Sequence, residues 1–399
     1  MIARSSASSQ WSLIVLCSGV LLFNACDAGP ANVQPLWDES AGWTIGAEQV
    51  RIGADEALAG HSLFRVRTAL RDPDGHIIVL NGGSNEVRVF DASGRQTRSF
   101  GGTGQGPREF SALVGIWLVG GDTLVTYDVG QGRLLAWPLP GGDPLPVPID
   151  VSHRPTIHGR FLSGAYLIGQ TRQPERREPG TQWIDSVSLT LVVRPDNTPM
   201  PIARLPYRTM YAAPTPGGGA GAIYTPVAYS GSASIATGPD GFYYGFGKDW
   251  IISKYNASGE VTDTITRQGA NVEFSEAMLD ALIEQRVAMV PPEQAAMMRT
   301  YVEAFPWPDR LSAYQTLQLD SSGCLWVQHT VPPGADTSIW SVFAANGRWL
   351  GEIAIPTKLR PTHIGDQALT VIETDTDGVE NVVVYAIEKP ARAANCMSA

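Results

Sequence analysis

The chain has 399 residues, a formal net charge of −10 and a low share of charged residues, 17%. A surface of this sign repels phosphate backbones, so the composition disfavours a nucleic-acid-binding protein. Glycine (42) and proline (29) are abundant, which is typical of an all-β chain with many tight turns. The length exceeds that of a usual single hydrophobic core, although a fold of repeated units can form one domain at this length because each unit carries its own core layer.

The N-terminal residues have the pattern of an export signal. Arg4 is the only charged residue before Asp27, and residues 11–23 form an apolar run. This run is too short to span a bilayer, which takes about 20 residues, and it has the length of the hydrophobic region of a secretory signal. We therefore predict that the chain is exported.

The residues after this run resemble the lipobox of bacterial lipoproteins, in which a cysteine after a small residue is lipidated and becomes the first residue of the mature protein. Ala25 precedes Cys26, while Phe23 and Asn24 depart from the usual residues. The resemblance implies a signal peptide over residues 1–26, lipidation at Cys26, and a protein of the bacterial cell envelope that faces the periplasm and touches the membrane only through its lipid. The alternative is ordinary signal-peptidase cleavage, which would give a soluble secreted protein.

A pattern of short strands and turns is repeated along the chain. It is clearest in residues 71–110, where three apolar runs are separated by turns rich in Asp, Asn and Gly, and it recurs in residues 238–259 and 320–347. These turn residues favour left-handed backbone and side-chain-to-backbone hydrogen bonds. Each segment is therefore predicted to form an antiparallel meander.

Less regular units occupy residues 114–151 and 156–205, and a sixth unit, residues 362–387, is one strand short. An isolated strand is predicted at residues 43–53. We expect it to complete the sixth unit by pairing with residues 381–387, because this closure removes the open edge of an incomplete sheet. The predicted fold class is all-β, a six-bladed β-propeller closed by an N-terminal strand.

Residues 100–110, FGGTGQGPREF, resemble the connection of an NHL-type repeat. More specifically, the chain is similar to bacterial six-bladed β-propeller lipoproteins, a largely uncharacterised family. We expect the glycines to let the chain cross from the outer strand of one blade to the inner strand of the next. Phe110 should then fill the space between the two blades. The glycines do not predict a nucleotide loop, because no helix follows them.

Two apolar segments interrupt the strand pattern. Residues 275–304 predict a helical hairpin, with Ser275 as the N-cap and two prolines between the helices. Residues 210–231 lack a strand pattern, so they do not supply a seventh blade. We expect both segments to meet over one face as the rim or lid of the main pocket. The alternative is a hairpin that packs on the outer edge of a blade. The candidate pocket-lining residues are Tyr211, Tyr224, Met297, Met298, Tyr301 and Trp307.

Catalytic motifs are weak, and the histidines show no metal-ligand spacing. A propeller can still bring residues from several blades to its axis, where imidazoles could bind zinc and carboxylates or amides could bind calcium. We prefer to interpret the candidate residues as surface or turn residues. The weak metal candidates are His153, His329, His363, Asn81, Asp128 and Asp249.

Two functions follow from this pattern. The sequence favours a non-catalytic module that binds a small ligand or a protein and needs no cofactor. The alternative is a metal-dependent hydrolase or lyase of the lactonase type, with calcium or zinc on the propeller axis.

The predicted organisation assigns residues 27–42 to a linker, residues 43–390 to the propeller and residues 391–399 to a flexible tail. Beyond the signal peptide and Cys26, two cysteines remain, Cys324 and Cys396. An oxidising compartment would allow them to form a disulfide. The alternative is a buried Cys324 and a free Cys396.

Overall fold

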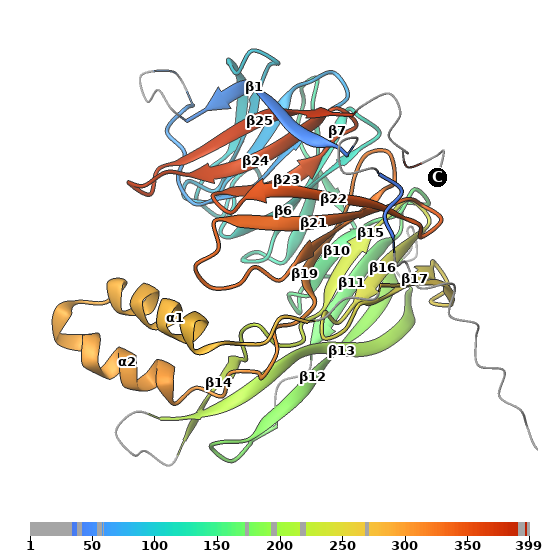
Figure 1. Ribbon diagram of the computed structural model, residues 1–399. Coiled ribbons are helices and arrows are strands. Elements are labelled where there is room, and N and C mark those ends of the chain that lie inside the picture. The colour runs from blue at the N-terminus through green and yellow to red at the C-terminus, as the bar shows by residue number, and fades with distance from the viewer. Residues whose placement is uncertain are drawn as a thin grey trace, which may run out of the picture.

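The computed structural model describes residues 34–37, 42–53, 58, 60–171, 175–192, 198–215, 221–267, 271–389 and Cys396. The predicted signal peptide with Cys26, and most of the predicted linker and tail, lie outside the described residues. Six antiparallel sheets form the blades of a β-propeller, as predicted (Figure 1). None of the helices in the described part is long and apolar enough to cross a membrane.

The first three blades follow one another along the chain. Blade 1 contains β2 (Val66–Arg71), β3 (Ile77–Asn81), β4 (Glu86–Phe90) and β5 (Gln96–Gly101). Blade 2 contains β6 (Leu113–Val119), β7 (Thr123–Asp128), β8 (Arg133–Pro138) and β9 (Leu145–Val147). Blade 3 contains β10 (Thr156–Arg160), β11 (Tyr166–Thr171), β12 (Gln182–Val192), β13 (Pro199–Pro214) and a fifth strand, β14 (Ala222–Pro226).

The last three blades complete the ring. Blade 4 contains β15 (Ser234–Thr237), β16 (Gly241–Gly245), β17 (Ile251–Asn256) and β18 (Val261–Thr266). Blade 5 contains β19 (Tyr314–Leu319), β20 (Leu325–His329), β21 (Thr337–Phe343) and β22 (Trp349–Pro356). Blade 6 contains β23 (Leu359–Ile364), β24 (Ala368–Thr374), β25 (Glu380–Glu388) and the N-terminal strand β1 (Thr44–Ile52). The first strand of each blade is the inner one: β2, β6, β10, β15 and β19 contact one another in series, and β23 contacts β2.

One turn type recurs where strands reverse. An Asp or Asn side-chain oxygen accepts the backbone N–H four residues later, and a glycine with φ between +80° and +90° stands just before that donor. Glycine is suited to this place because it has no Cβ to clash in left-handed backbone. The turn residues that accept these bonds are Asp72, Asp91, Asn256, Asp320 and Asp375.

The connection from blade 1 to blade 2 has the predicted role. Phe110 is completely buried and packs with the hydrophobic residues of both blades, including Phe100 and Trp137. Gly101 and Gly102 have φ of +98° and +115°, and a Cβ on Gly101 would collide with the Phe110 ring. The glycines therefore allow the tight crossing, and Phe110 fills the space between the blades.

The N-terminal strand closes the ring, as predicted. β1 pairs antiparallel with β25, from Thr44 opposite Glu388 to Ile52 opposite Val382. The segment before β1 also crosses to blade 5, where the backbone N–H of Trp37 donates to the carbonyl of Leu350 at 2.7 Å. Blade 6 is thus completed by both ends of the chain.

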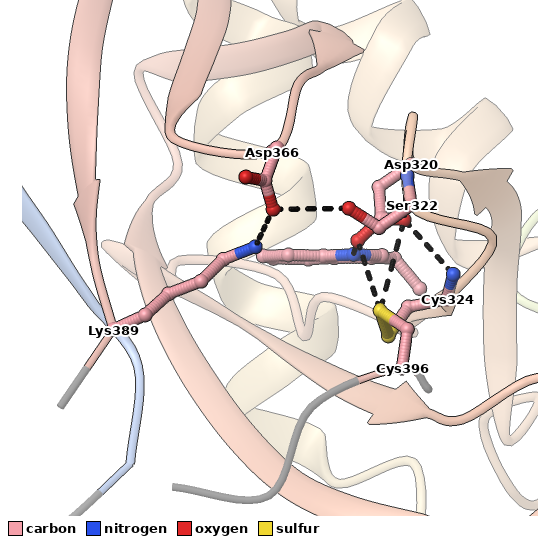
Figure 2. Close-up of a disulfide and its surroundings, with 7 residues drawn as sticks. Asp320, Ser322, Cys324, Asp366, Lys389 and Cys396 are labelled. Carbon is pink, nitrogen blue, oxygen red and sulfur yellow. Dashed lines mark hydrogen bonds and ion pairs between the residues drawn. A yellow bond between two sulfur atoms is a disulfide. The ribbon is translucent and has the colours of Figure 1, made fainter. Parts of the chain in front are cut away.

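A disulfide joins the C-terminal tail to blade 5. Cys324, completely buried at the start of β20, pairs with Cys396, and their Cα atoms are 5.1 Å apart. Figure 2 shows the surrounding polar groups: Asp366 accepts from Lys389 at 2.9 Å and from Ser322 at 3.0 Å. The alternative of a free Cys396 does not hold in this structure, and the tail is fixed at this residue.

The helical hairpin has the predicted boundaries. Residues 210–231 supply no seventh blade, as predicted, but the expectation that they lack strands is wrong. Helices α1 (Glu276–Ala288) and α2 (Ala295–Glu303) are separated by a short 3₁₀ turn, η1 (Pro292–Gln294), and the Ser275 side chain accepts from the N–H of Met278. Residues expected to lack strands instead extend β13 and form β14. Pairing with β12 as far as Tyr211, and with β14 up to Pro214, stabilises this extension. The Ala-, Gly- and Pro-rich local sequence does not predict it.

Removal of β1 tests the closure. A chain that begins at residue 54 should aggregate or unfold without cooperativity, because the edge of β25 is left unpaired. The control is a chain that begins at residue 42, which keeps β1 and loses only the crossing of Trp37. Light scattering and thermal denaturation would report the result. A monomer that begins at residue 54 and melts like the control would contradict the role given to β1.

Candidate functional site

The two long projections rise from one face of the ring. The strands of each blade are antiparallel, so two kinds of connection emerge on the same side of the ring. One kind joins the second strand of a blade to the third, and the other joins the outer strand to the inner strand of the next blade. The hairpin lies between the outer strand β18 and the inner strand β19, and the extended end of β13 leads to β14. Figure 1 shows the hairpin on the side toward which β13 extends, and α2 lines a groove with the end of that strand. We call this side the insertion face.

The hairpin stands on a short two-stranded stem. Phe274 N–H donates to the Asp309 carbonyl at 3.0 Å, and Leu311 N–H donates to the Val272 carbonyl at 2.8 Å. Its helices share a small core of their own, formed by Leu282, Ile283, Val302 and neighbouring aromatic residues, apart from the six clusters of the blades. The aromatic residues of this core are Tyr229, Phe274 and Trp307. The hairpin therefore has its own packing and does not complete a blade.

A cavity of about 710 Å³ opens between this stem and the extended strands of blade 3. We call it the face cavity. Its apolar wall includes Trp183 and Phe246. Four charged residues of both signs also line it, Lys248, Asp249, Asp309 and Arg310, and none forms a side-chain ion pair with another described residue. A volume of this size, with aromatic and charged walls, is typical of a small-molecule site.

An apolar groove adjoins the face cavity. It has a volume of about 450 Å³ and lies between the end of β13 and α2. Tyr211 and Phe305 meet edge to face there, with ring centroids 5.7 Å apart. Met297 is 60% exposed and Tyr301 is 46% exposed. Phe305 lines the groove and Pro308 lines the face cavity, so only a short segment of the chain separates the groove from the face cavity.

The sequence-based lining residues divide between the groove and the supporting structure. Tyr211, Met297 and Tyr301 line the groove. Met298 and Trp307 pack in the hairpin core, where the Trp307 ring stacks on Phe274. None of the six candidates lines the face cavity.

Tyr224 has a different place. Its ring lies edge-on to Trp183, with centroids 5.3 Å apart, and its hydroxyl accepts the N–H of Arg177 at 2.7 Å. Apart from Asp249, the face-cavity residues were missed because they come from six separate segments of the chain. A sequence signal was present in the pair of charges at Asp309 and Arg310, directly after the aromatic linker.

A polar cluster borders the face cavity between blades 4 and 5. Arg267 lies over the ring of Trp349, 4.0 Å from its centroid, and pairs with Glu352 at 2.7 Å. Nε2 of His329 lies 3.1 Å from Arg267 and 2.8 Å from the hydroxyl of Ser341. Burial lowers the pKa of His329 to about 4, against the opposing effect of Glu352. The imidazole is thus neutral at pH 7 and accepts from Arg267.

This arrangement does not resemble a hydrolytic triad. In a triad, the base contacts the nucleophile through one ring nitrogen and the orienting acid through the other. Here Ser341, Arg267 and Glu352 all approach the same nitrogen, Nε2 of His329. The cluster joins two blades through an ion pair and hydrogen bonds.

The metal candidates are not brought together. Asn81 and Asp128 are buried and stabilise turns: the Asn81 side chain donates to the Ser84 hydroxyl, and Asp128 accepts the N–H of Gly130. Each also holds the segment before its inner strand, since Asn81 accepts the N–H of Phe64 and Asp128 accepts that of Ser111. The other four candidates lie apart, in an exposed turn (His153), the polar cluster (His329), the inner strand of blade 6 (His363) and the mouth of the face cavity (Asp249).

Among the described residues, two groups of three potential metal ligands have their ligand atoms within 4.8 Å of one another. Asp72, Asp74 and His76 form a turn, and Asp320 lies beside Cys324 and Cys396, whose sulfurs are joined. Neither group includes a metal candidate from the sequence. The residues proposed for a lactonase-type metal site therefore do not form one.

Comparison with known proteins agrees with the fold. The family DUF5128, described as a 6-bladed beta-propeller, matches residues 62–148, which include blade 1 and the motif at residues 100–110. Among curated proteins, no match to this chain was found. The chain is a six-bladed β-propeller.

Three solved structures illustrate the similarity. A DUF4221 protein from Bacteroides vulgatus is 9% identical, with 87% of this chain and 98% of that chain covered and a TM-score of 0.51. A protein from Bacteroides fragilis that is inferred to be exported is 10% identical (90% and 98% covered, TM-score 0.48). The calcium-binding protein regucalcin from Agrobacterium tumefaciens is 12% identical (86% and 95% covered, TM-score 0.43). The likeness to the DUF4221 structure supports the fold alone.

The neutral state of His329 predicts a pH dependence of stability. Its pKa in the folded protein, about 4, lies below the ordinary value of 6.5. The unfolded chain therefore takes up a proton first, and stability should fall as the pH decreases from about 6.5 to 4. His329→Gln should reduce this fall, measured by thermal denaturation across the pH range. The control is His153→Gln in the exposed turn, and equal effects of both substitutions would contradict the assignment.

Proposed function

We propose that the protein is a lipid-anchored binding module of the bacterial cell envelope, which captures a ligand at the insertion face. The observation that carries the proposal is the face cavity, where charges of both signs stand without ion-pair partners among the described residues. Unpaired groups of both signs suit a ligand that itself carries a cation and an anion. The adjoining groove offers apolar surface for a longer ligand or for part of a protein.

The polar groups near the cavity support binding rather than catalysis. The hydroxyls of Ser312 and Thr330 lie 2.7 Å apart and are hydrogen-bonded to each other. His329 is engaged by Arg267 and Ser341. A nucleophile needs a base that is free to take its proton, and these contacts hold the nearby groups in structural bonds.

Two features support the location. The N-terminal residues have the pattern of a lipoprotein signal, with Cys26 as the lipidated residue. The disulfide between Cys324 and Cys396 agrees with an oxidising compartment such as the periplasm. Attachment through a lipid would leave the propeller outside the bilayer, with its insertion face available to ligands.

Replacement of residues 275–304 by a short Gly/Ser linker tests the binding face. The blades should remain folded, because the hairpin core is separate from the blade cores. Ligand or partner retention should be lost, measured by cross-linking and co-purification of the lipidated protein from its native membrane. If the replacement unfolds the propeller, the hairpin is a structural support and the proposed binding role fails.

A matched pair of substitutions refines the same test. Met297→Glu places a charge in the apolar groove, whereas Met289→Glu places one at a comparably exposed position (67%) that does not line the groove. Only the groove substitution should reduce retention. Equal retention by both variants would show that the groove does not contact the captured molecule.

Lipidation is tested by Cys26→Ala. In detergent phase separation, the parent protein should enter the detergent phase and the variant the aqueous phase. The change should be large, because each buried methylene group of an acyl chain contributes about 0.8 kcal/mol to membrane binding. Unchanged partitioning would exclude lipidation at this cysteine, although the face cavity would remain a binding site.

A further inference from the structure

A second cavity lies on the propeller axis, on the side opposite the insertion face. It has a volume of about 480 Å³, and the ends of all six inner strands line it. We call it the axial cavity. Each blade contributes to its wall, through residues that include Arg71, Trp117, Arg160, Pro239, Asp320 and His363.

Two cations of the axial cavity lack an anionic partner, while the guanidinium of Arg160 lies over the ring of Tyr166, 5.9 Å from its centroid. Arg71 and Arg160 are half-buried, and neither guanidinium forms an ion pair or hydrogen bond with another described residue. This contrasts with arginines elsewhere, such as Arg267, which pairs with Glu352. In a chain with a net charge of −10, two unpaired arginines on the wall of one cavity form a local site for an anion.

The acid on the described wall of this cavity is already engaged. Asp320 is buried, and its carboxylate accepts from the backbone N–H groups of Ser322 and Cys324 and from the indole of Trp326. Its oxygens are therefore occupied within blade 5, and they do not neutralise the arginines.

His363 adds a neutral polar group to the wall. Burial, together with the charge of Arg71, lowers the pKa of His363 to about 4, so the ring is uncharged at pH 7. Its Nδ1 is buried and has no hydrogen-bond partner among the described residues. The rest of the wall is largely apolar, with Leu70, Ile116 and Ile364 among its residues.

We propose that the axial cavity binds a small organic carboxylate with an apolar body. A guanidinium matches the two oxygens of a carboxylate in a fork of parallel hydrogen bonds. The apolar wall would cover the rest of the molecule, and the volume lies in the range of small-molecule sites. This site is independent of the proposed binding at the insertion face, because the two cavities share no lining residue.

Calorimetric titration of the full mature chain tests the site with acetate, hexanoate, benzoate and indole-3-acetate. At least one of the larger carboxylates should bind, whereas benzamide, the neutral counterpart of benzoate, should not. Arg71→Gln combined with Arg160→Gln should weaken binding about tenfold or more, because each change removes a charge-assisted hydrogen-bond donor. Arg95→Gln, in an exposed turn, is the matched control and should bind like the parent.

Other outcomes would overturn the assignment. They are the absence of binding by every carboxylate, equal binding by the double variant, or binding of inorganic phosphate in preference to the larger carboxylates.

A second measurement on the unmodified protein covers the case in which the double variant does not fold. The bound carboxylate should shift the NMR signal of His363, identified with His363→Gln, and an unchanged signal would exclude this cavity. Loss of the hairpin should leave this binding intact, which separates the test from that of the insertion face.

Discussion

The structure depends on the closure of the ring in blade 6, where the N-terminal strand β1 pairs with β25. Each hydrophobic cluster of this propeller lies largely between neighbouring blades, as Phe110 shows for blades 1 and 2. A blade without a neighbour would therefore expose one side of its packing. Closure converts six incomplete surfaces into six buried ones, and it requires that the two ends of the chain meet in a single sheet.

Three kinds of interaction hold this junction. Backbone hydrogen bonds join β1 to β25. Trp37, Trp43 and Trp326 form an aromatic series across the junction, with centroid distances of 5.0 Å and 6.0 Å. The disulfide fixes Cys396 to blade 5. The N-terminal segment crosses to blade 5, so opening of the ring would have to break strand pairing and aromatic packing together, and the disulfide separately fixes the tail to the same blade.

Closure also frees the two faces for other purposes. Blade strands and their repeated turns are committed to packing and backbone hydrogen bonds, whereas the insertion face carries the hairpin and the extension of blade 3. The two faces differ in their cavities: the face cavity has charges of both signs, and the axial cavity has two arginines among apolar residues. The axial cavity needs the closed ring, because all six blades line it, whereas the face cavity lies between blades 3 and 4 and the hairpin stem.

The sequence by itself determined the elements whose causes are local. The Asp/Asn-x-x-Gly turns specify their own hydrogen bonds, the motif at residues 100–110 specifies the blade crossing, and Ser275 specifies the start of α1. The missing strand of the sixth unit also indicated that residues 43–53 close the ring, because an incomplete sheet has an unpaired edge.

The tertiary structure decided what depends on distant residues. Residues 210–214 form strand because β13 continues along β12 as far as Tyr211, and residues 222–226 form strand because they pair with β13. The disulfide forms because the tail returns to blade 5. The face cavity and the axial cavity gather side chains that are up to several hundred positions apart in the sequence, such as Arg71 and His363. No local pattern records that proximity, since it arises only when the blades are arranged about a common axis.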